Sequence, residues 1–156
     1  MINAYDTEDG VVFDMSNLEC EALRSYADGL LGDPEHPFVE LLRSQGLVVG
    51  DTPVPHLAAL LQAFSQATKV LTAWVVAPAG CRRATFFVGP HSAAVSRCDN
   101  GGLYADEGDM VSVWAIDSAQ LRDTFFELSA IGEPSGEGVL PTAVPEVLFS
   151  ALEQGD

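Results

Sequence analysis

Apolar residues recur at helical spacing in the first part of the chain. Residues 16–19 (Ser-Asn-Leu-Glu) have the form of a capping box, in which the serine and glutamate side chains each bond the backbone N–H of the other residue. The apolar stripe that follows predicts a helix ending at Gly32. Two more helices are predicted at 37–45, before Gly46, and at 55–67, where Pro55 suits a first helical turn. The chain therefore opens with three helices.

After residue 68 the pattern changes to that of β-strands. A Pro-Ala-Gly turn at 78–80 and an Asp-Asn-Gly-Gly sequence at 99–102, which predicts a hairpin, separate the apolar runs. Strands joined by such short turns leave no room for crossover helices, so the sheet must be antiparallel. Four or five strands are predicted, at 70–76, 82–88, 93–97, 103–105 and 110–116, with a further short strand at 11–13.

The ends of the chain complete the prediction. A helix is expected from Asp117 or Ser118 to about residue 131, then a loop at 133–138 and a final helix at 144–152. The polar and acidic residues 1–10 are expected to form a mobile tail. The sequence thus predicts one α+β domain over 11–156, in which helices flank one face of an antiparallel, meandering four- to five-stranded sheet.

The charge of the chain narrows the classes of partner. Seven Lys and Arg residues stand against 23 Asp and Glu residues, which gives a net charge of -16 over 156 residues. Such a surface repels phosphate backbones and anionic lipids, so neither nucleic acid nor membrane is an expected partner. The polar first ten residues do not form a signal peptide, and no apolar run reaches the ~20 residues of a membrane span. A cytoplasmic location is expected.

Candidate catalytic and metal-binding residues are sparse. The three cysteines lack zinc-site or disulfide spacing, and the histidines His36, His56 and His91 fall in turns or at helix starts, without a nucleophile motif. An acidic turn carries Asp106, Glu107 and Asp109 but lacks the spacing of a calcium loop. We therefore predict no enzyme, no cofactor and no metal site. The alternative is a small enzyme or ligand-binding domain whose pocket between sheet and helices uses His91 or this turn.

Aromatic residues on the predicted strands are the candidates for partner binding. They are Trp74, Phe86, Phe87 and Trp114. Because Phe86 and Phe87 are neighbours, they point to opposite faces of the sheet. If helices cover only one face, the other presents a surface for a protein partner or a second copy. Burial of both faces by helices is the alternative.

The order of the elements resembles one half of the EspG family, the cytosolic chaperones of actinobacterial type VII (ESX) secretion. The resemblance spans residues 11–131 and rests on apolar and turn patterns, without a specific motif. Its residues are FVELLRSQGLV at 38–48, LTAWV at 71–75, ATFFVG at 84–89, AAVSR at 93–97 and VSVW at 111–114.

The resemblance implies a function and an assembly. EspG proteins have two related α+β halves around a pseudo-two-fold axis and hold the tips of helical PE–PPE substrates soluble before export. This chain has about half the family's usual length, so the resemblance implies a homodimer that rebuilds both halves. The expected function is that of a non-enzymatic cytosolic binding protein, an EspG-like chaperone or adaptor for helical secretion substrates. No binding residue is carried over from the family.

Overall fold

The computed structural model describes residues 1–78, 80–101 and 106–129. The chain divides into two compact units, Met1–Ser118 and Ala119–Asp156, where the sequence predicted one domain over 11–156. The first unit contains the sheet and three helices, and the second is described through helix α4. No helix among the described residues is both long enough and apolar enough to cross a membrane.

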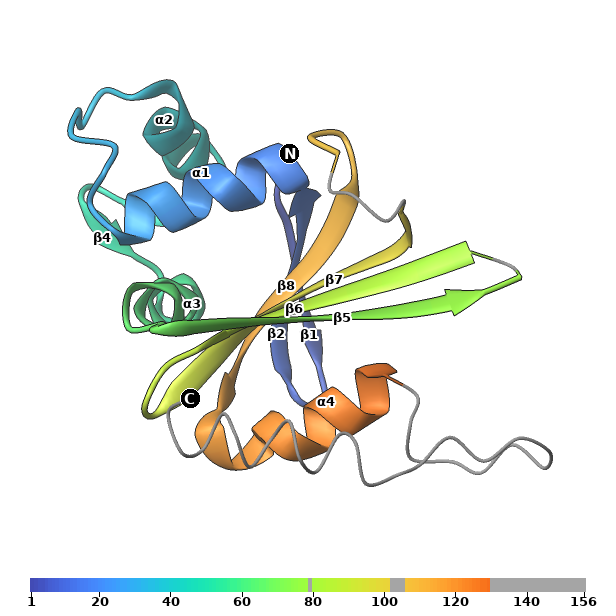
Figure 1. Ribbon diagram of the computed structural model, residues 1–156. Helices are drawn as coiled ribbons and strands as arrows, with labels where there is room; N and C mark the ends of the chain where they lie inside the picture. Colours follow the sequence, from blue (N-terminus) through green and yellow to red (C-terminus); the bar gives the residue numbers. More distant parts are fainter. Residues whose placement is uncertain (79, 102–105, 130–156) are drawn as a thin grey trace, which may run out of the picture. The chain divides into compact units, whose positions relative to one another are not determined.

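Six antiparallel strands form the main sheet, in the order β1-β2-β8-β7-β6-β5 (Figure 1). Strands β5 to β8 are the predicted meander, and the N-terminal hairpin adds two strands beside β8. The predicted antiparallel α+β fold is confirmed. The strands are β1 (Asn3–Thr7), β2 (Gly10–Ser16), β5 (Lys69–Ala77), β6 (Gly80–Val88), β7 (Ser92–Gly101) and β8 (Met110–Asp117).

The N-terminal segment corrects the prediction of a mobile tail over residues 1–10. Strand β1 pairs with β2 from Asn3, opposite Asp14, to Thr7, opposite Gly10. Ile2 is buried, and its backbone N–H and C=O both bond the side-chain amide of Gln45 at 3.3 Å. All five residues of β1 are exposed, so this edge strand lacks the apolar alternation that would have revealed it.

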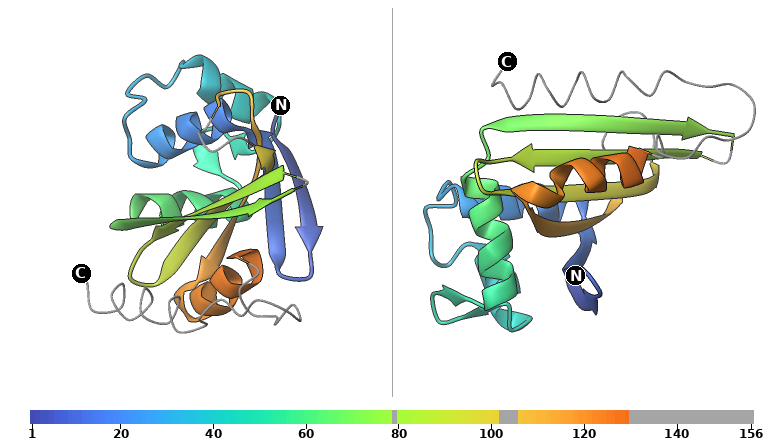
Figure 2. Two further views of the ribbon diagram at one scale, coloured as in Figure 1. Left: turned by 45° about the vertical axis from the view of Figure 1, so that its right-hand side comes forward. Right: turned by 90° about the horizontal axis from the view of Figure 1, so that it is seen from below.

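Three helices belong to the first unit, and two of them, α1 and α3, pack on one face of the sheet (Figure 2). The helices are α1 (Asn17–Ala27), α2 (Pro37–Ser44) and α3 (Pro55–Ser65), with a small hairpin of β3 (Val48–Val49) and β4 (Thr52–Pro53) between the last two. The core between helices and sheet includes Phe13, Met15, Leu23, Leu57, Leu60, Phe87 and Val113.

Helix α1 is shorter than predicted. It ends at Ala27, whereas the apolar stripe predicted an end at Gly32. Gly29 adopts a φ of +69°, a left-handed conformation that glycine reaches without strain and that ends the helix. Leu30, which the stripe placed on the buried side, is 74% exposed. The prediction for α2 was more accurate, because Gly46, at φ +71°, follows its C-cap residue as expected.

The predicted hairpin at 99–102 is wrong in its position. Strand β7 continues to Gly101, and Asp99 and Gly101 pair with Arg82 and Cys81 of β6, across an irregular register. The hairpin signal was overridden because β6 begins at Gly80 and offers partners to these residues. The predicted strand at 103–105, the loop at 133–138 and the helix at 144–152 lie outside the described residues.

The second unit contains α4 (Leu121–Ser129), preceded by a 3-10 turn at Ser118–Gln120. The helix was predicted to run from Asp117 or Ser118 to about residue 131, and its described part agrees with that range. The rings of Phe125 and Phe126 meet edge to face, with centroids 6.2 Å apart, and the Ser129 hydroxyl donates to the Phe125 carbonyl oxygen at 2.7 Å.

Candidate functional site: a groove beside edge strand β5

A groove of about 360 Å³ lies between α1 and the strands β5, β6 and β7. Alternation along each strand brings every second residue to this face of the sheet. We call it the Trp74 groove. Helix α1 contributes Asn17, Cys20, Glu21 and Arg24, and the strands contribute Val70, Thr72, Trp74, Arg83, Thr85, Phe87 and Ser96.

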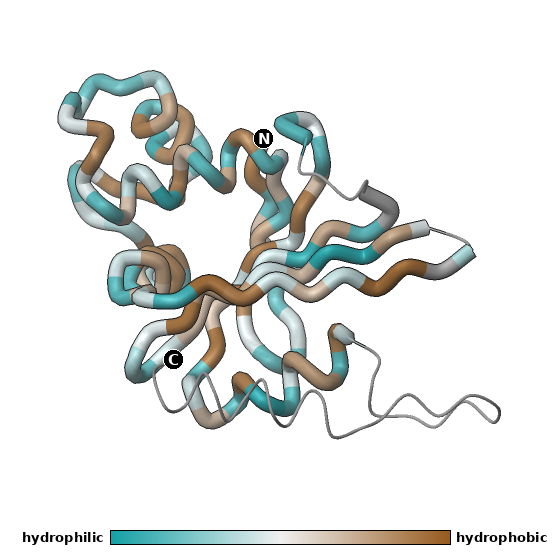
Figure 3. The backbone as a smooth tube through the Cα atoms, viewed as in Figure 1, coloured by the Kyte–Doolittle hydropathy of each residue, from teal (hydrophilic) through white to brown (hydrophobic). Residues whose placement is uncertain are grey.

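The outer wall of the Trp74 groove is formed by exposed apolar side chains of β5. Val70 and Trp74, which line the groove, are 60% and 51% exposed, and they share the face that carries Phe87. Val76, 71% exposed, continues this face along β5 beyond the groove. Figure 3 shows the apolar stretches along this strand. A tryptophan buries more area than most side chains when a partner covers it, so its exposure at a groove favours a binding role.

The floor of the Trp74 groove is fixed by Phe87, which is only 7% exposed. Its ring meets that of Phe64 from α3 edge to face, at a centroid distance of 5.2 Å. The Arg24 guanidinium lies 4.4 Å from the centroid of the Phe87 ring, within the range of a cation–π contact. Glu21 accepts from Arg24 Nη1 at 3.1 Å and holds it there. The groove is thus preformed on this side.

The strands around the groove hold most of the positive charge of this acidic chain. Residues 69–101 contain four of the seven basic residues and a single acidic residue, Asp99, a local net charge of +3 (four minus one). Arg83, at 8% exposure, approaches the Asp109 carboxylate at 3.5 Å. By strand alternation Lys69, Arg82 and Arg97 lie on the opposite face of the sheet, so Arg83 is the one of the four that lines the groove.

The acidic turn holds helix α1 in place. The backbone carbonyls of Asp109 and Glu107 accept from the N–H groups of Asn17 and Leu18, at 2.7 and 3.1 Å. These N–H groups belong to the first turn of α1, where backbone N–H groups have no acceptor inside the helix. Within residues 1–78, 80–101 and 106–129, no three His, Cys, Asp or Glu side chains are grouped as metal ligands would be. We assign the turn a structural role.

The histidines lie away from the groove. His36 caps α2, because its Nδ1 accepts from the Phe38 N–H at 3.1 Å. His56 and His91 are exposed, and the His91 carbonyl accepts from the Ser118 N–H at 3.0 Å. A pocket between sheet and helix does exist, as expected for the alternative of a small enzyme or ligand-binding domain. In the described part of the chain, however, its lining includes neither His91 nor the acidic turn.

The four aromatic candidates divide between the two faces of the sheet. Phe86 and Phe87 point to opposite faces, as predicted, but they are 0% and 7% exposed and so do not form an open surface. Trp114 shares the Phe86 face and is partly exposed. Only Trp74 stands exposed in the groove. Arg24 was missed, because nothing in the sequence indicates which side of α1 meets β6.

The Cys20 thiol lines the groove but is not a candidate nucleophile. Burial, followed by the charge of Glu21, raises its pKa to about 12. The thiol therefore stays protonated near neutral pH, while a reactive cysteine needs a lowered pKa.

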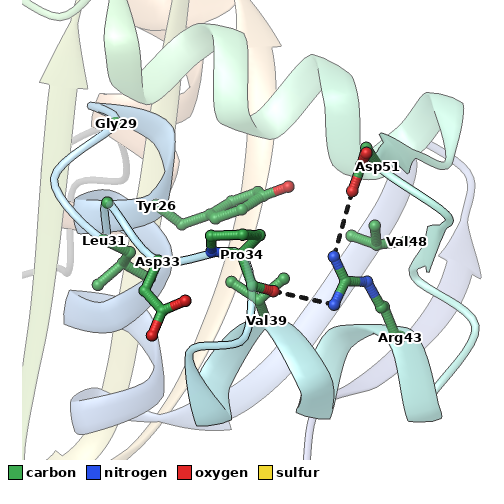
Figure 4. A pocket seen from close by; sticks show the side chains of 10 residues that line it. Tyr26, Gly29, Leu31, Asp33, Pro34, Val39, Arg43, Val48 and Asp51 are labelled. Carbon is green, nitrogen blue, oxygen red and sulfur yellow. Dashed lines mark hydrogen bonds and ion pairs between the residues drawn. The ribbon is translucent and has the colours of Figure 1, made fainter.

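A second, smaller cavity of about 200 Å³ lies beside α2 (Figure 4). Arg43 dominates it, and its guanidinium donates to the carbonyls of Gly50 and Pro34 at 3.0 and 2.9 Å and to the Asp51 carboxylate at 3.2 Å. A hydrogen bond to Glu40 also raises the pKa of Arg43. These bonds join α2 to the loop before it and to the β3–β4 turn, so Arg43 acts as a structural clamp.

No family model, curated protein or solved structure matches this chain. The resemblance to the EspG family stays a prediction. The functional argument therefore rests on the Trp74 groove.

Proposed function

We propose that this chain is a non-enzymatic binding protein that holds a segment of a partner protein in the Trp74 groove. The observation that supports the proposal most is the indole of Trp74, 51% exposed at the rim of a groove whose floor, Phe87, is fixed by Phe64 and Arg24. Tryptophan and arginine are the residues most often found at the energetic centres of protein interfaces.

The shape and chemistry of the groove suit a peptide segment. Val70 and Trp74 provide an apolar wall, and Thr72 and Thr85 provide hydroxyl groups between wall and floor. An amphipathic helix that lies in a groove presents apolar side chains in this way. With the EspG resemblance, a helical segment of a type VII secretion substrate is the specific candidate. Such a chaperone or adaptor would work in the cytoplasm.

A small ligand in the same groove is the alternative. The volume of about 360 Å³ falls within the range of roughly 300–1,000 Å³ of small-molecule sites. The charged groups argue against a small anion, because Arg24 already pairs with Glu21 and Arg83 with Asp109. A protein segment anchored by Trp74 therefore fits the groove better.

A photo-reactive phenylalanine analogue at position 74, introduced in the native cell, tests the proposal. We expect it to cross-link to one protein other than a second copy of this chain, at a segment that mass spectrometry can map. The matched control places the analogue at Tyr5, 41% exposed on the opposite edge of the sheet. Trp74→Ala should weaken binding of the mapped segment by about 30-fold, the equivalent of ~2 kcal/mol. Identical adducts at both positions, or no protein adduct at position 74, would contradict the proposal.

A further inference from the structure

We propose that two copies of this chain pair through β5, antiparallel and about a two-fold axis at Ala73, so that their sheets become continuous. The inference concerns the edge of β5, whereas the proposed function concerns the groove beside it. It deepens that function, because such pairing would bring two Trp74 grooves together. The partner that we propose for the edge of β5 is a second copy of this chain.

The outer edge of β5 is the feature that would pair with the second copy. Strand β5 is the last of the sheet, and among the described residues no strand pairs with its outer side. Alternate residues of an edge strand direct backbone N–H and C=O groups outward, where another strand can pair with them. Natural edges are usually protected by charge, proline or shortness. Over its nine residues β5 has no proline and one charged residue, Lys69, at its start.

The sequence of β5 is complementary to itself when two copies run antiparallel. A two-fold axis perpendicular to the sheet keeps residues of the same face opposite each other and uses all nine residues. A shift of two residues would leave the end of each strand unpaired. Apart from the Lys69–Ala77 pairs at the ends, the opposed pairs are Val70 with Val76, Leu71 with Val75, Thr72 with Trp74, and Ala73 with Ala73 of the second copy. β-branched and aromatic side chains are favourable in such pairs.

Strand β5 carries no carboxylate that would repel a second copy at this edge. Two copies with a net charge of -16 repel each other over most of their surface. Between residues 69 and 101 the only acidic residue is Asp99, and both Arg82 and Arg97 contact its carboxylate, at 2.8 and 3.3 Å. The two Lys69 residues would lie eight residues apart along the paired strands, about 27 Å. At β5, therefore, two copies meet without opposing carboxylates.

The pairing has a consequence for the Trp74 groove. A two-fold axis perpendicular to the sheet leaves the α1 helices of both copies on the same face. Trp74 of each copy would then be a diagonal neighbour of the other, with Cα atoms about 7–8 Å apart, within reach of aromatic side chains. The two grooves would form one binding surface that spans the axis.

The first test is the mass of the chain in solution, across a range of concentrations, by light scattering and sedimentation. We expect twice the 16.6 kDa of one chain. Val76→Glu should raise the dimer dissociation constant about tenfold or more. Val49→Glu is the matched control, since Val49 of β3 is 70% exposed and Val76 is 71% exposed. A single-chain mass at all concentrations, or equal dissociation of both variants, would overturn the proposal.

The second test locates the axis by a disulfide. In a Cys81→Ser background, Ala73→Cys should cross-link two copies under mild oxidation, because directly opposed residues lie ~4.5–5.5 Å apart, within disulfide range. Leu71→Cys is the control, because two copies of residue 71 would be about 13 Å apart. Equal cross-linking of both variants, or none, would overturn the register. A dimer whose adducts at position 74 contain only a second copy of this chain would keep this inference and remove the proposed function.

Discussion

The two edges of the main sheet differ in length, charge and exposure of apolar side chains. Strand β1 is five residues long, and its charged and polar residues include Asp6, with Glu8 and Asp9 in the turn that follows. Strand β5 is nine residues long and exposes Val70, Trp74 and Val76. Short, charged edges discourage pairing with other chains, whereas long apolar edges invite it. We therefore expect a second copy to pair with β5 and not with β1.

The largest expected effect distinguishes the buried Phe87 of β6 from the exposed Trp74 of β5. Phe87→Ala should lower the free energy of unfolding by about 3–5 kcal/mol, because it removes a buried ring packed on Phe64. Trp74→Ala should lower it by less than about 1 kcal/mol, since half of the indole is already in water. Urea unfolding in a Val76→Glu background, which is expected to weaken the proposed pairing of copies, measures both. An equal loss for both variants would mean that Trp74 serves the stability of the fold.

The second prediction concerns the β1 edge. Ile2→Ala should lower the free energy of unfolding by about 2 kcal/mol, because Ile2 is only 6% exposed. Tyr5→Ala is the control on the same segment. Tyr5 is 41% exposed, and its hydroxyl donates to Asp14 at 3.3 Å, so its loss should cost about 0.5 kcal/mol. Thermal and urea unfolding measure the two variants. Unchanged stability in Ile2→Ala would restore the prediction of a mobile tail.

The elements that the sequence predicted well carry local signals. Ser16 and Glu19 form the expected capping box, with hydrogen bonds of 2.8 and 3.1 Å between side chains and backbone. Gly46 ends α2 where a left-handed residue was expected. The β5–β8 meander follows from alternation and short turns. The sequence did not predict strand β1, because an exposed edge strand has no apolar period. It did not predict the end of β7 either, because that segment depends on pairing with β6.

The candidate site was less predictable than the fold. The sequence named Trp74 as a candidate for partner binding from its residue type alone. Its position at a groove depends on the register of β5 with β6, in which Trp74 lies opposite Arg83. Phe86 and Phe87 were assigned to partner binding from type as well, but both are buried. The place of Arg24 over Phe87 depends on how α1 crosses the sheet. Predicting a groove between elements that are distant in sequence requires knowing how those elements pack.

The smallest predicted effect concerns the attachment of the β1 edge to α1 through Glu19. Burial by itself would raise the pKa of this carboxyl, but hydrogen bonds from the Met1 ammonium at 2.7 Å and the Ser16 N–H at 2.8 Å leave it below its ordinary 4.5. A lowered pKa stabilises the fold above pH 4.5, and this contribution is lost as the pH falls through the folded value.

Glu19→Ala should therefore lower the free energy of unfolding by about 1 kcal/mol near pH 7, and by less in acid. Glu19→Gln keeps a capping oxygen for the Ser16 N–H but loses the ion pair with the Met1 ammonium, so it should cost only a few tenths of a kcal/mol. Urea unfolding of both variants at neutral and acidic pH measures these losses in the free energy of unfolding. If the two variants were equally unstable at neutral pH, the ion pair and not the cap would hold β1 to α1, and the protection of this edge would depend on the charge of the N-terminus.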